Sequence, residues 1–420
     1  MNGPNIKQTG QIVVIGAGIV GLSTATWLSR EGFTVVIVDR GDQKMAASYG
    51  NAGAIVPSSI IPVTVPGLIA KAPKMLLSPD SPLFMKWSYL PKLAPWLLRY
   101  LSQCRKNNVE KISAALAPLL ADSVEQHLAL SNGTQAEKYF RHSDYLFAFN
   151  GRSDFISDEF TWNIRKKHSV KWIEMTSDEI REYDPSLASS IGFAVRFPGH
   201  GFVTDPGAYI SALKNNFRLD GGKIIKAEVK NFEITELGIT KVYTDRETLE
   251  CDKAVICGGA WSAGLTEKLG IRIPLETERG YHIELVEPST VPRAPTMIAS
   301  GKCVISPMED RLRCAGIVEF GGLLAKPSEA PFKLLLKHVV AAFPSLRWKE
   351  TRKWMGHRPA PSDSVPFIGE VASIKGLYMA FGHHHVGMTA GPKTGRIISD
   401  LVSGRKPDFD LQPYRPERFS

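Results

Sequence analysis

The chain has 420 residues, of which 43% are hydrophobic and 22% charged, so it can bury a large core, and we expect two domains. Its formal net charge of +9 comes from dispersed basic residues without a nucleic-acid-binding motif, which argues against a nucleic-acid partner. Five cysteines without CxxC spacing argue against a zinc site. They are typical of reduced thiols, and with no secretory signal at the start they predict a cytoplasmic protein.

The first strong motif is QIVVIGAGIVGLSTATWLSREGFTVVIVDR, residues 11–40. An apolar strand, a glycine-rich turn, a helix and a second apolar strand ending at Asp39 form a β-α-β dinucleotide-binding pattern. Gly16 allows the tight turn, Gly18 lets the backbone approach a diphosphate, and Gly21 lets helix and strand pack closely. The helix N-terminus faces the diphosphate, and Asp39 is placed to accept hydrogen bonds from ribose hydroxyls. The neighbours predicted to share this site are Ile19, Val20 and Arg40.

Two more glycine-rich strand ends lie far downstream. One follows a predicted strand at 254–257, and the other joins a strand at 377–381 to a helix from about 388 to 402. Three such ends along one chain predict a long dinucleotide held by a discontinuous domain, which favours FAD over the NAD of a simple dehydrogenase. The contacts predicted from these segments are Gly258, Gly259, Trp261, Gly382, His383, Gly387, Met388 and Thr389, and Val229 is a further predicted contact.

Two further segments have open interpretations. In ASYGNAG, the residues Ser48, Asn51 and Gly53 offer small side chains and amides for the cofactor, but a plain tight turn would use the same residues. In SPLFMKWSYLPKLAPWLLRYLSQC, residues 81–104, tryptophan and leucine alternate with lysine and arginine. This stretch is too interrupted to span a bilayer, and it suits either a helix pair on the core or an interfacial membrane contact.

Seven ordered motifs resemble the D-amino-acid oxidase superfamily of flavoproteins, most closely its bacterial D-amino-acid dehydrogenase branch, over essentially the whole chain. They are VVIGAGIVGLSTA, ASYGNAG, SPLFMKW…WLLRYLSQC, GFVTDPGAYISAL, ERGYHIEL, WMGHRPAPSDSVPFIG and FGHHHVGMTAGPKTG. The resemblance implies an α/β fold with a Rossmann-like FAD-binding domain and a second α+β substrate domain built on a mixed sheet with helices. We expect the FAD-binding domain at 10–82, 205–275 and 346–410, and the substrate domain at 83–204 and 276–345.

The resemblance also implies the reaction. A D-amino acid would lose a hydride from Cα to flavin N5, and the imino acid would hydrolyse to a 2-oxo acid or remain a cyclic imine. Residues 81–104 and the positive charge favour a peripheral contact with the cytoplasmic membrane and a quinone as electron acceptor. The alternatives are oxidation of a secondary amine such as D-hydroxyproline, sarcosine or glycine, and a role as one flavoprotein subunit of a multi-protein oxidase complex.

The three consecutive histidines lie in the loop before the last predicted helix. The resemblance places this loop, with His383, at the N1 and C2 carbonyl edge of the flavin, where a helix N-terminus stabilises developing negative charge. Metal binding is the alternative, although consecutive loop side chains diverge and no neighbouring ligand completes a site. Family members carry small residues after His383, so His384 or His385 is expected either in the substrate pocket or in loop packing.

Arg358, in WMGHRPAPSD, is the predicted substrate-binding residue. We expect a rigid turn there to hold its guanidinium for bidentate binding of a carboxylate, the role that the resemblance implies; a surface arginine paired with Asp363 or Glu370 is the alternative. Tyr281 and His282 are expected on a strand of the substrate domain, where neighbours point to opposite faces. Tyr281 is the one favoured for the pocket, and the alternative is a core aromatic.

Overall fold

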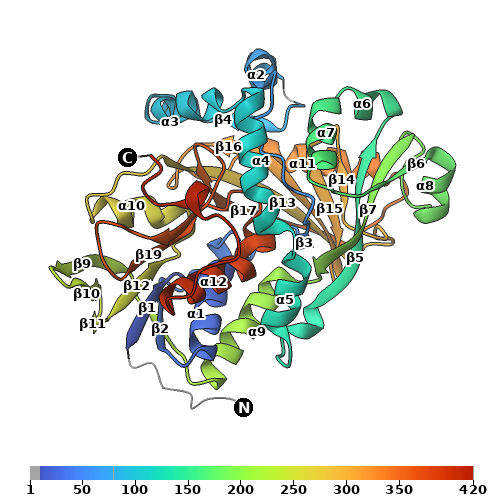
Figure 1. Ribbon diagram of the computed structural model, residues 1–420. Coiled ribbons are helices and arrows are strands. Elements are labelled where there is room, and N and C mark those ends of the chain that lie inside the picture. The colour runs from blue at the N-terminus through green and yellow to red at the C-terminus, as the bar shows by residue number, and fades with distance from the viewer. Residues whose placement is uncertain (1–9, 79, 420) are drawn as a thin grey trace.

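The structure, a computed structural model, describes residues 10–78 and 80–419. Its first large sheet has six strands, ordered β18-β19-β12-β1-β2-β8 (Figure 1). All of them are parallel except β18, which pairs antiparallel with β19. The strand bounds are β1 Gln11–Ile15, β2 Thr34–Asp39, β8 Lys223–Lys226, β12 Lys253–Ile256, β18 Phe367–Glu370 and β19 Leu377–Phe381.

The central strands of this sheet are almost continuously apolar because both of their faces are buried. One face packs on helices α1 (Ile19–Arg30), α4 (Lys106–Leu120), α5 (Ser123–Ser131), α9 (Pro206–Leu219) and α12 (Gly387–Val402). The other face packs on a three-stranded sheet of β9 (Val229–Thr235), β10 (Gly238–Thr244) and β11 (Thr248–Glu250). Helices α1 and α12 lie side by side (Figure 1), and a Cβ on Gly395 would come within 2.5 Å of the Ser23 backbone.

The second large sheet has ten strands, eight of which follow the order β17-β13-β16-β15-β14-β5-β7-β3, with β4 paired to β16 and β6 to β7. Helix α11 (Glu329–Ala342) packs on one of its faces. The strand bounds are β3 Ala54–Ile55, β4 Leu83–Met85, β5 Phe140–Phe149, β6 Ile173–Thr176, β7 Phe193–Val203, β13 Leu275–Val286, β14 Thr296–Ile298, β15 Cys303–Pro307, β16 Arg311–Phe320 and β17 Glu350–Pro361. The remaining helices are α2 Leu68–Leu77, α3 Leu90–Ser102, α6 Arg152–Ile156, α7 Glu159–Lys167, α8 Ser177–Tyr183 and α10 Ser262–Glu267.

The predicted α/β class is confirmed, with a parallel sheet covered by helices beside a mixed sheet. The stretch 81–104, for which a helix pair was one interpretation, holds the short strand β4 followed by helix α3. The expected domain boundaries stay a prediction. Strand β17 lies in the ten-stranded sheet beside β13, although 346–410 was assigned to the FAD-binding domain.

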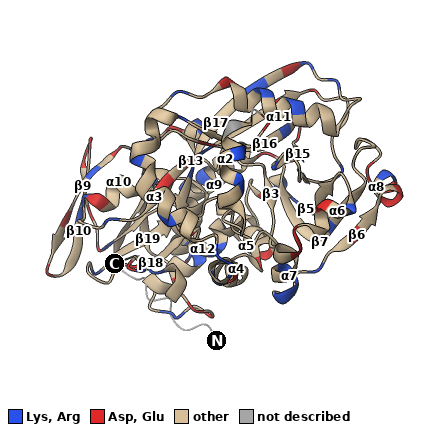
Figure 2. Ribbon diagram, turned by 90° about the horizontal axis from the view of Figure 1, so that it is seen from above, with Lys and Arg blue, Asp and Glu red and all other residues tan. Residues whose placement is uncertain are grey.

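Charged residues of both signs are interspersed over the elements (Figure 2). Across 10–78 and 80–419, every helix is either too short or too polar to cross a bilayer. The five cysteines are buried free thiols.

Candidate active site

A cavity of about 1610 Å³ lies where the carboxyl ends of β1, β2, β12 and β19 meet the ten-stranded sheet. Its size exceeds the ~300–1,000 Å³ of sites for drug-sized ligands. Open parallel sheets bind ligands outside the carboxyl ends of their strands, so the position fits a nucleotide. The other wall, from β13, β16, β17 and β5, can hold a second, smaller ligand.

The β1–α1 turn has the geometry expected of its glycines. Gly16 has φ +112°, and a Cβ there would lie 2.5 Å from the Cys257 carbonyl oxygen. A Cβ on Gly21 would lie 2.0 Å from the Gly16 carbonyl oxygen, so this glycine is required by packing inside the protein. Gly18 differs, because it borders the cavity and its Cβ would meet only the Ser48 hydroxyl at 3.3 Å.

Polar groups around this turn are joined across segments. The Ile19 amide at the N-terminus of α1 donates to Ser48 Oγ at 3.0 Å, so the ASYGNAG loop caps the helix. The Asp39 carboxylate accepts from the Ala17 amide at 2.7 Å and from the Gly41 amide at 2.8 Å. Each carboxylate oxygen keeps a further lone pair, so ribose binding by Asp39 stays a prediction.

The other predicted cofactor residues gather around the same cavity. Arg40 lies with its guanidinium 4.2 Å from the centre of the Trp261 ring, and Thr389 Oγ1 accepts from the Val56 amide at 3.3 Å. Gly21 and Gly53 do not border the cavity; a Cβ on Gly53, at φ +78°, would lie 2.4 Å from the Val203 carbonyl oxygen. Those that border it are Gly16, Gly18, Ile19, Val20, Asp39, Arg40, Ser48, Asn51, Val229, Gly258, Gly259, Trp261, Gly382, His383, Gly387, Met388 and Thr389.

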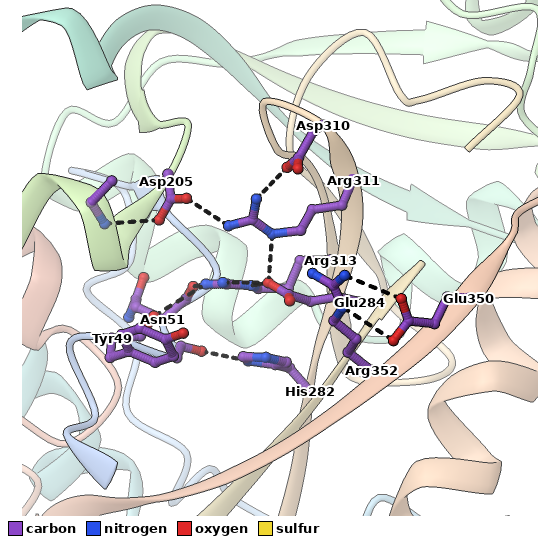
Figure 3. A network of polar contacts seen from close by, with 12 residues as sticks. Tyr49, Asn51, Asp205, His282, Glu284, Asp310, Arg311, Arg313, Glu350 and Arg352 are labelled. Carbon is purple, nitrogen blue, oxygen red and sulfur yellow. Dashed lines mark hydrogen bonds and ion pairs between the residues drawn. The ribbon is translucent and has the colours of Figure 1, made fainter. Parts of the chain in front are cut away.

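The loop at 49–51 is tied to the ten-stranded sheet through its carbonyl groups (Figure 3). Arg313 on β16 donates to the carbonyl oxygens of Tyr49, at 3.4 Å, and Asn51. His282 Nδ1 on β13 lies 2.9 Å from the Gly50 carbonyl oxygen. The sheet therefore fixes the loop that borders the nucleotide side of the cavity.

Glu284 holds Arg313 in place, with 2.6 Å between its Oε1 and Arg313 Nη2. Burial alone would raise the pKa of Glu284, but the charges and hydrogen bonds of Arg313 and Arg311 outweigh it and lower the pKa to about 2. Arg311 also pairs with Asp205 at 2.7 Å, which extends the network to the start of α9 (Figure 3).

Arg358 lies on the opposite wall of the cavity. Its guanidinium covers Gly280, where a Cβ would lie 2.4 Å from Arg358 Cζ. Nη1 donates to the Ile317 carbonyl oxygen at 3.1 Å and Nη2 to the Gly316 carbonyl oxygen at 3.3 Å. A guanidinium has five N–H donors, so donors remain for a ligand.

The structure corrects the expected turn at Arg358 and excludes the alternative ion pairs with Asp363 and Glu370. Arg358 is a residue of strand β17, not of a turn, so sheet pairing fixes its backbone. Neither Asp363 nor Glu370 pairs with it, because Asp363 binds Arg418 at 2.7 Å and Glu370 accepts from the Gly376 amide at 2.9 Å.

A bulge in β16 provides the carbonyl groups under Arg358. The pairing of β13 with β16 shifts register between Gly280 and Tyr281, and Ile317 has φ +57°. A β-branched residue at positive φ is a strained backbone conformation, which persists only where the surrounding structure fixes it. The bulge thus orients the two acceptors that hold the guanidinium.

Glu278 is a site residue that we did not predict. It lies opposite Arg358 in the β13–β17 pairing and is 2% exposed. Its carboxylate lies 2.6 Å from His384 Nε2 and accepts from the Tyr100 hydroxyl at 3.2 Å. Burial alone would raise the pKa of Glu278, but His384 and then Arg358 outweigh it and lower the pKa. The site therefore holds an ionised carboxylate beside the arginine.

The three histidines take different roles in the structure. His383 Nε2 lies 2.9 Å from Thr394 Oγ1, His384 pairs with Glu278, and His385 Nδ1 is buried without a hydrogen-bond partner. Burial lowers the pKa of His383 and of His385 to about 3, so both are neutral near pH 7. No group of three potential metal ligands is found within the part of the chain that the structure describes.

Tyr281 and His282 point to opposite sides of β13, as the alternation of a strand requires. Tyr281 touches the cavity wall, but its hydroxyl is turned towards Glu319, at 2.5 Å, and its ring packs on Phe332 of α11. A role of Tyr281 in the substrate pocket stays a prediction, and its packing on Phe332 fits the alternative of a core aromatic. On β13 the cavity is bordered by Glu278, Gly280 and Tyr281.

The family model described as DAO, FAD dependent oxidoreductase, matches residues 11–401. A D-amino-acid oxidase of Bradyrhizobium diazoefficiens is 38% identical over 415 residues, covering 97% of this chain and 98% of that protein. This chain belongs to the DAO family. A D-amino acid dehydrogenase of Rhizorhabdus wittichii is 26% identical over 417 residues, covering 97% of this chain and 100% of its own length. The predicted family and its FAD cofactor are thus confirmed, and the protein is an FAD-dependent oxidoreductase.

Solved structures show the same fold. Glycine oxidase from Bacillus cereus superposes with a TM-score of 0.71 at 21% identity, over 95% of this chain and 96% of the other. L-proline dehydrogenase from P. horikoshii superposes with a TM-score of 0.73 at 19% identity, over 99% of this chain and 98% of the other.

The residues present fit FAD. The cavity is long enough to be reached by all three strand ends, and Gly18 leaves its turn open to the cavity, as a diphosphate requires. Helices α1 and α12 both begin there, and neither is capped by the side chain of its own N-cap residue. Ser48 Oγ occupies the Ile19 amide of α1, so the other amides of each first turn are the candidate donors to the diphosphate.

Replacing Arg313 with methionine is expected to weaken FAD binding roughly 10-fold or more, because the carbonyl groups of the 49–51 loop lose their donor and Glu284 loses one of its two arginine partners. The rise in FAD fluorescence as the cofactor dissociates on dilution measures the affinity of each variant for FAD. Arg352→Met is the matched control, since Arg352 pairs with Glu350 at the exposed end of β17 (Figure 3). Equal FAD affinity in both variants would show that the network does not position the loop.

Proposed function

We propose that this protein oxidises a D-amino acid at the carbon that carries the amine, giving an imino acid that water converts to a 2-oxo acid and ammonia. The observation that carries the proposal is Arg358, a guanidinium held on Gly280 by two carbonyl groups, with donors left over at the cavity. Its planar fork suits a carboxylate. The names of the 38% and 26% identical relatives support an amino-acid substrate of D configuration.

The protein's own residues bind and orient the substrate. Arg358 binds the carboxylate, and Glu278 with His384 stands beside it, where the ionised carboxylate favours an amine over a second anion. Fixing the substrate in one orientation removes much of the entropic cost of reaction. Bound FAD supplies the two-electron acceptor.

We propose that the reduced flavin passes its electrons to a quinone, which the protein reaches at a membrane surface. Helices α2 and α3 border the cavity and project at one end of the molecule (Figure 1). They and the segment between them expose Ile69, Trp87 and Leu98, which are 55, 59 and 71% exposed. Exposed basic residues accompany them, namely Lys71, Lys74, Lys92 and Arg99. Apolar side chains beside positive charge suit an anionic lipid surface.

Bleaching of the flavin absorbance without oxygen, across D- and L-amino acids and proline derivatives, tests the reaction. We expect rapid bleaching by D-amino acids and none by their L-enantiomers. Bleaching by secondary amines alone would favour D-hydroxyproline, sarcosine or glycine as the substrate class, and no bleaching by any of them would favour a subunit of a larger oxidase complex. Reoxidation follows in the same cuvette. Quinone in anionic phospholipid vesicles should restore the absorbance faster than air does, and the reverse order would identify an oxidase.

A further inference from the structure

A second arginine, Arg165 on α7, borders the same cavity far from Arg358. It is only 7% exposed, and it makes no ion pair with any carboxylate of residues 10–78 and 80–419. Its Nη1 donates to Thr161 Oγ1 at 3.1 Å, and its Nε is buried without a partner. Charged side chains at such depth are almost always paired, so an unpaired guanidinium needs an explanation.

The nearest acidic residue does not neutralise Arg165. Asp158, an exposed residue before the first turn of α7, accepts from the Thr161 hydroxyl at 2.7 Å but lies beyond ion-pair distance of the guanidinium. Burial lowers the pKa of Arg165 to about 10, and Asp158 only partly opposes that effect. Arg165 therefore stays positively charged near pH 7 without a partner.

Aromatic rings hold this charge at the cavity. The guanidinium carbon lies 4.5 Å from the ring centre of Trp162 and 5.6 Å from that of Phe147. Cation–π contacts orient a guanidinium while leaving its N–H edge free for an anion. Arg165, Thr161 and Phe147 all border the cavity, so this edge is reached from inside it.

The position is separate from the proposed carboxylate site at Arg358. Arg165 packs on Phe147 of β5, whereas Arg358 rests on β16, and β15 and β14 lie between these strands. Three steps of ~4.8 Å amount to about 14 Å along the sheet. A ligand that binds both arginines must therefore be extended along the sheet.

We propose that Arg165 forms a second carboxylate-binding site, at the β5 end of the cavity. The carboxylate belongs either to the far end of an extended substrate or to a separate small acid, and both present the same chemistry to the guanidinium. The site adds a specificity element for anionic ligands to the oxidation proposed above.

Acetate is the probe for this site, because it is the smallest carboxylate. The FAD-loaded protein is melted in acetate and in chloride at equal ionic strength, as wild type, Arg358→Met, Arg165→Met and the double variant. We expect acetate to stabilise Arg358→Met more than chloride does, and the double variant to lose this difference, with the apparent acetate dissociation constant raised about 10-fold or more. A smaller stabilisation by acetate in Arg358→Met than in the wild type would show that Arg358 binds a carboxylate, so this comparison tests the proposed function separately.

The same melts distinguish a binding role from a structural one. Removing an unpaired buried charge should leave the melting temperature of Arg165→Met in chloride unchanged or higher. A lower melting temperature in chloride, or an acetate effect that is equal in Arg358→Met and the double variant, would overturn the proposal. Arg196→Met is the matched control, since Arg196 pairs with Asp144 at 3.2 Å and does not border the cavity, so its acetate effect should equal that of wild type.

Substrate kinetics then assign the source of the carboxylate. If Arg165→Met raises KM for a D-amino acid with a remote carboxylate and leaves KM for D-alanine unchanged, the site binds the far end of the substrate. If both substrates keep their KM while the acetate effect is lost, the site binds a separate acid. A KM raised equally for both substrates would indicate distortion of the active site and would count against a distinct subsite.

Discussion

Arg358→Ala is expected to raise KM and to slow flavin reduction together, with a loss of about 2 to 5 kcal/mol in kcat/KM. The truncation removes the substrate carboxylate's partner and leaves Glu278 with His384 but without the arginine charge. The Ile317 and Gly316 carbonyl groups lose their donor as well. Stopped-flow reduction of the FAD-loaded variant under nitrogen, with the flavin content measured first, gives both constants.

Arg358→Lys separates geometry from charge. A lysine keeps the charge but cannot donate to both carbonyl groups and bind a carboxylate in two places, so we expect an intermediate loss. An amine that lacks the carboxylate is the matched control substrate. It should react poorly with the wild type and be almost unaffected by either variant. Equal losses for the acid and the amine would show that Arg358 supports the fold or the flavin, and the amino-acid assignment would then rest on the relatives alone.

The nucleotide half of the site could be predicted because its determinants are local. Gly16, Gly18, Gly21 and Asp39 lie within 24 residues, and the role expected of each follows from one turn and one helix N-terminus. The expected strand and helix at 377–381 and 388–402 likewise match β19 and α12 to within one residue. An apolar run that ends in glycine predicts a strand and the turn after it without knowledge of which distant strands pair with it.

The substrate half depends on pairings between distant strands, which no local pattern encodes. Glu278 reaches Arg358 and His384 only because β13 pairs with β17, and the bulge at Ile317 is invisible in the sequence. The one available signal was alternation in LETERGYHIEL, where Glu278, His282 and Glu284 are polar residues at even-numbered positions. That spacing marks one face of β13, and it would have placed Tyr281 on the other.

Arg165 and Arg313 illustrate the same limit for charges. Both are arginines in ordinary-looking segments, and only burial distinguishes them from solvated surface residues. Arg313 is paired with Glu284, which explains its burial, whereas Arg165 has no ion-pair partner among the described residues, which is the basis of the second site proposed above. The sequence alone shows neither how deeply an arginine is buried nor which residue it pairs with.

Gly18→Val is expected to yield a folded protein that does not retain FAD. The φ of Gly18 is −74°, which valine tolerates, and its Cβ would meet only Ser48 Oγ at 3.3 Å, so the chain itself can accommodate the change. The valine methyl groups would occupy the cavity beside the N-terminus of α1, where the diphosphate is expected. Overpacking of this kind costs about 1 to 3 kcal/mol, so FAD affinity should fall roughly 5- to 150-fold.

Gly21→Ala is the contrasting control for this prediction, because the added methyl group would lie 2.0 Å from the Gly16 carbonyl oxygen, inside the protein and away from the cavity. That clash should lower the melting temperature of the protein with and without FAD, whereas Gly18→Val should keep the melting temperature of the FAD-free wild type. Flavin-to-protein absorbance ratios after purification and melting curves with added FAD measure the two effects. A Gly18→Val protein that purifies with one FAD per chain would show that the diphosphate does not pass over this turn, and the placement of the nucleotide at the β1 end of the cavity would have to be abandoned.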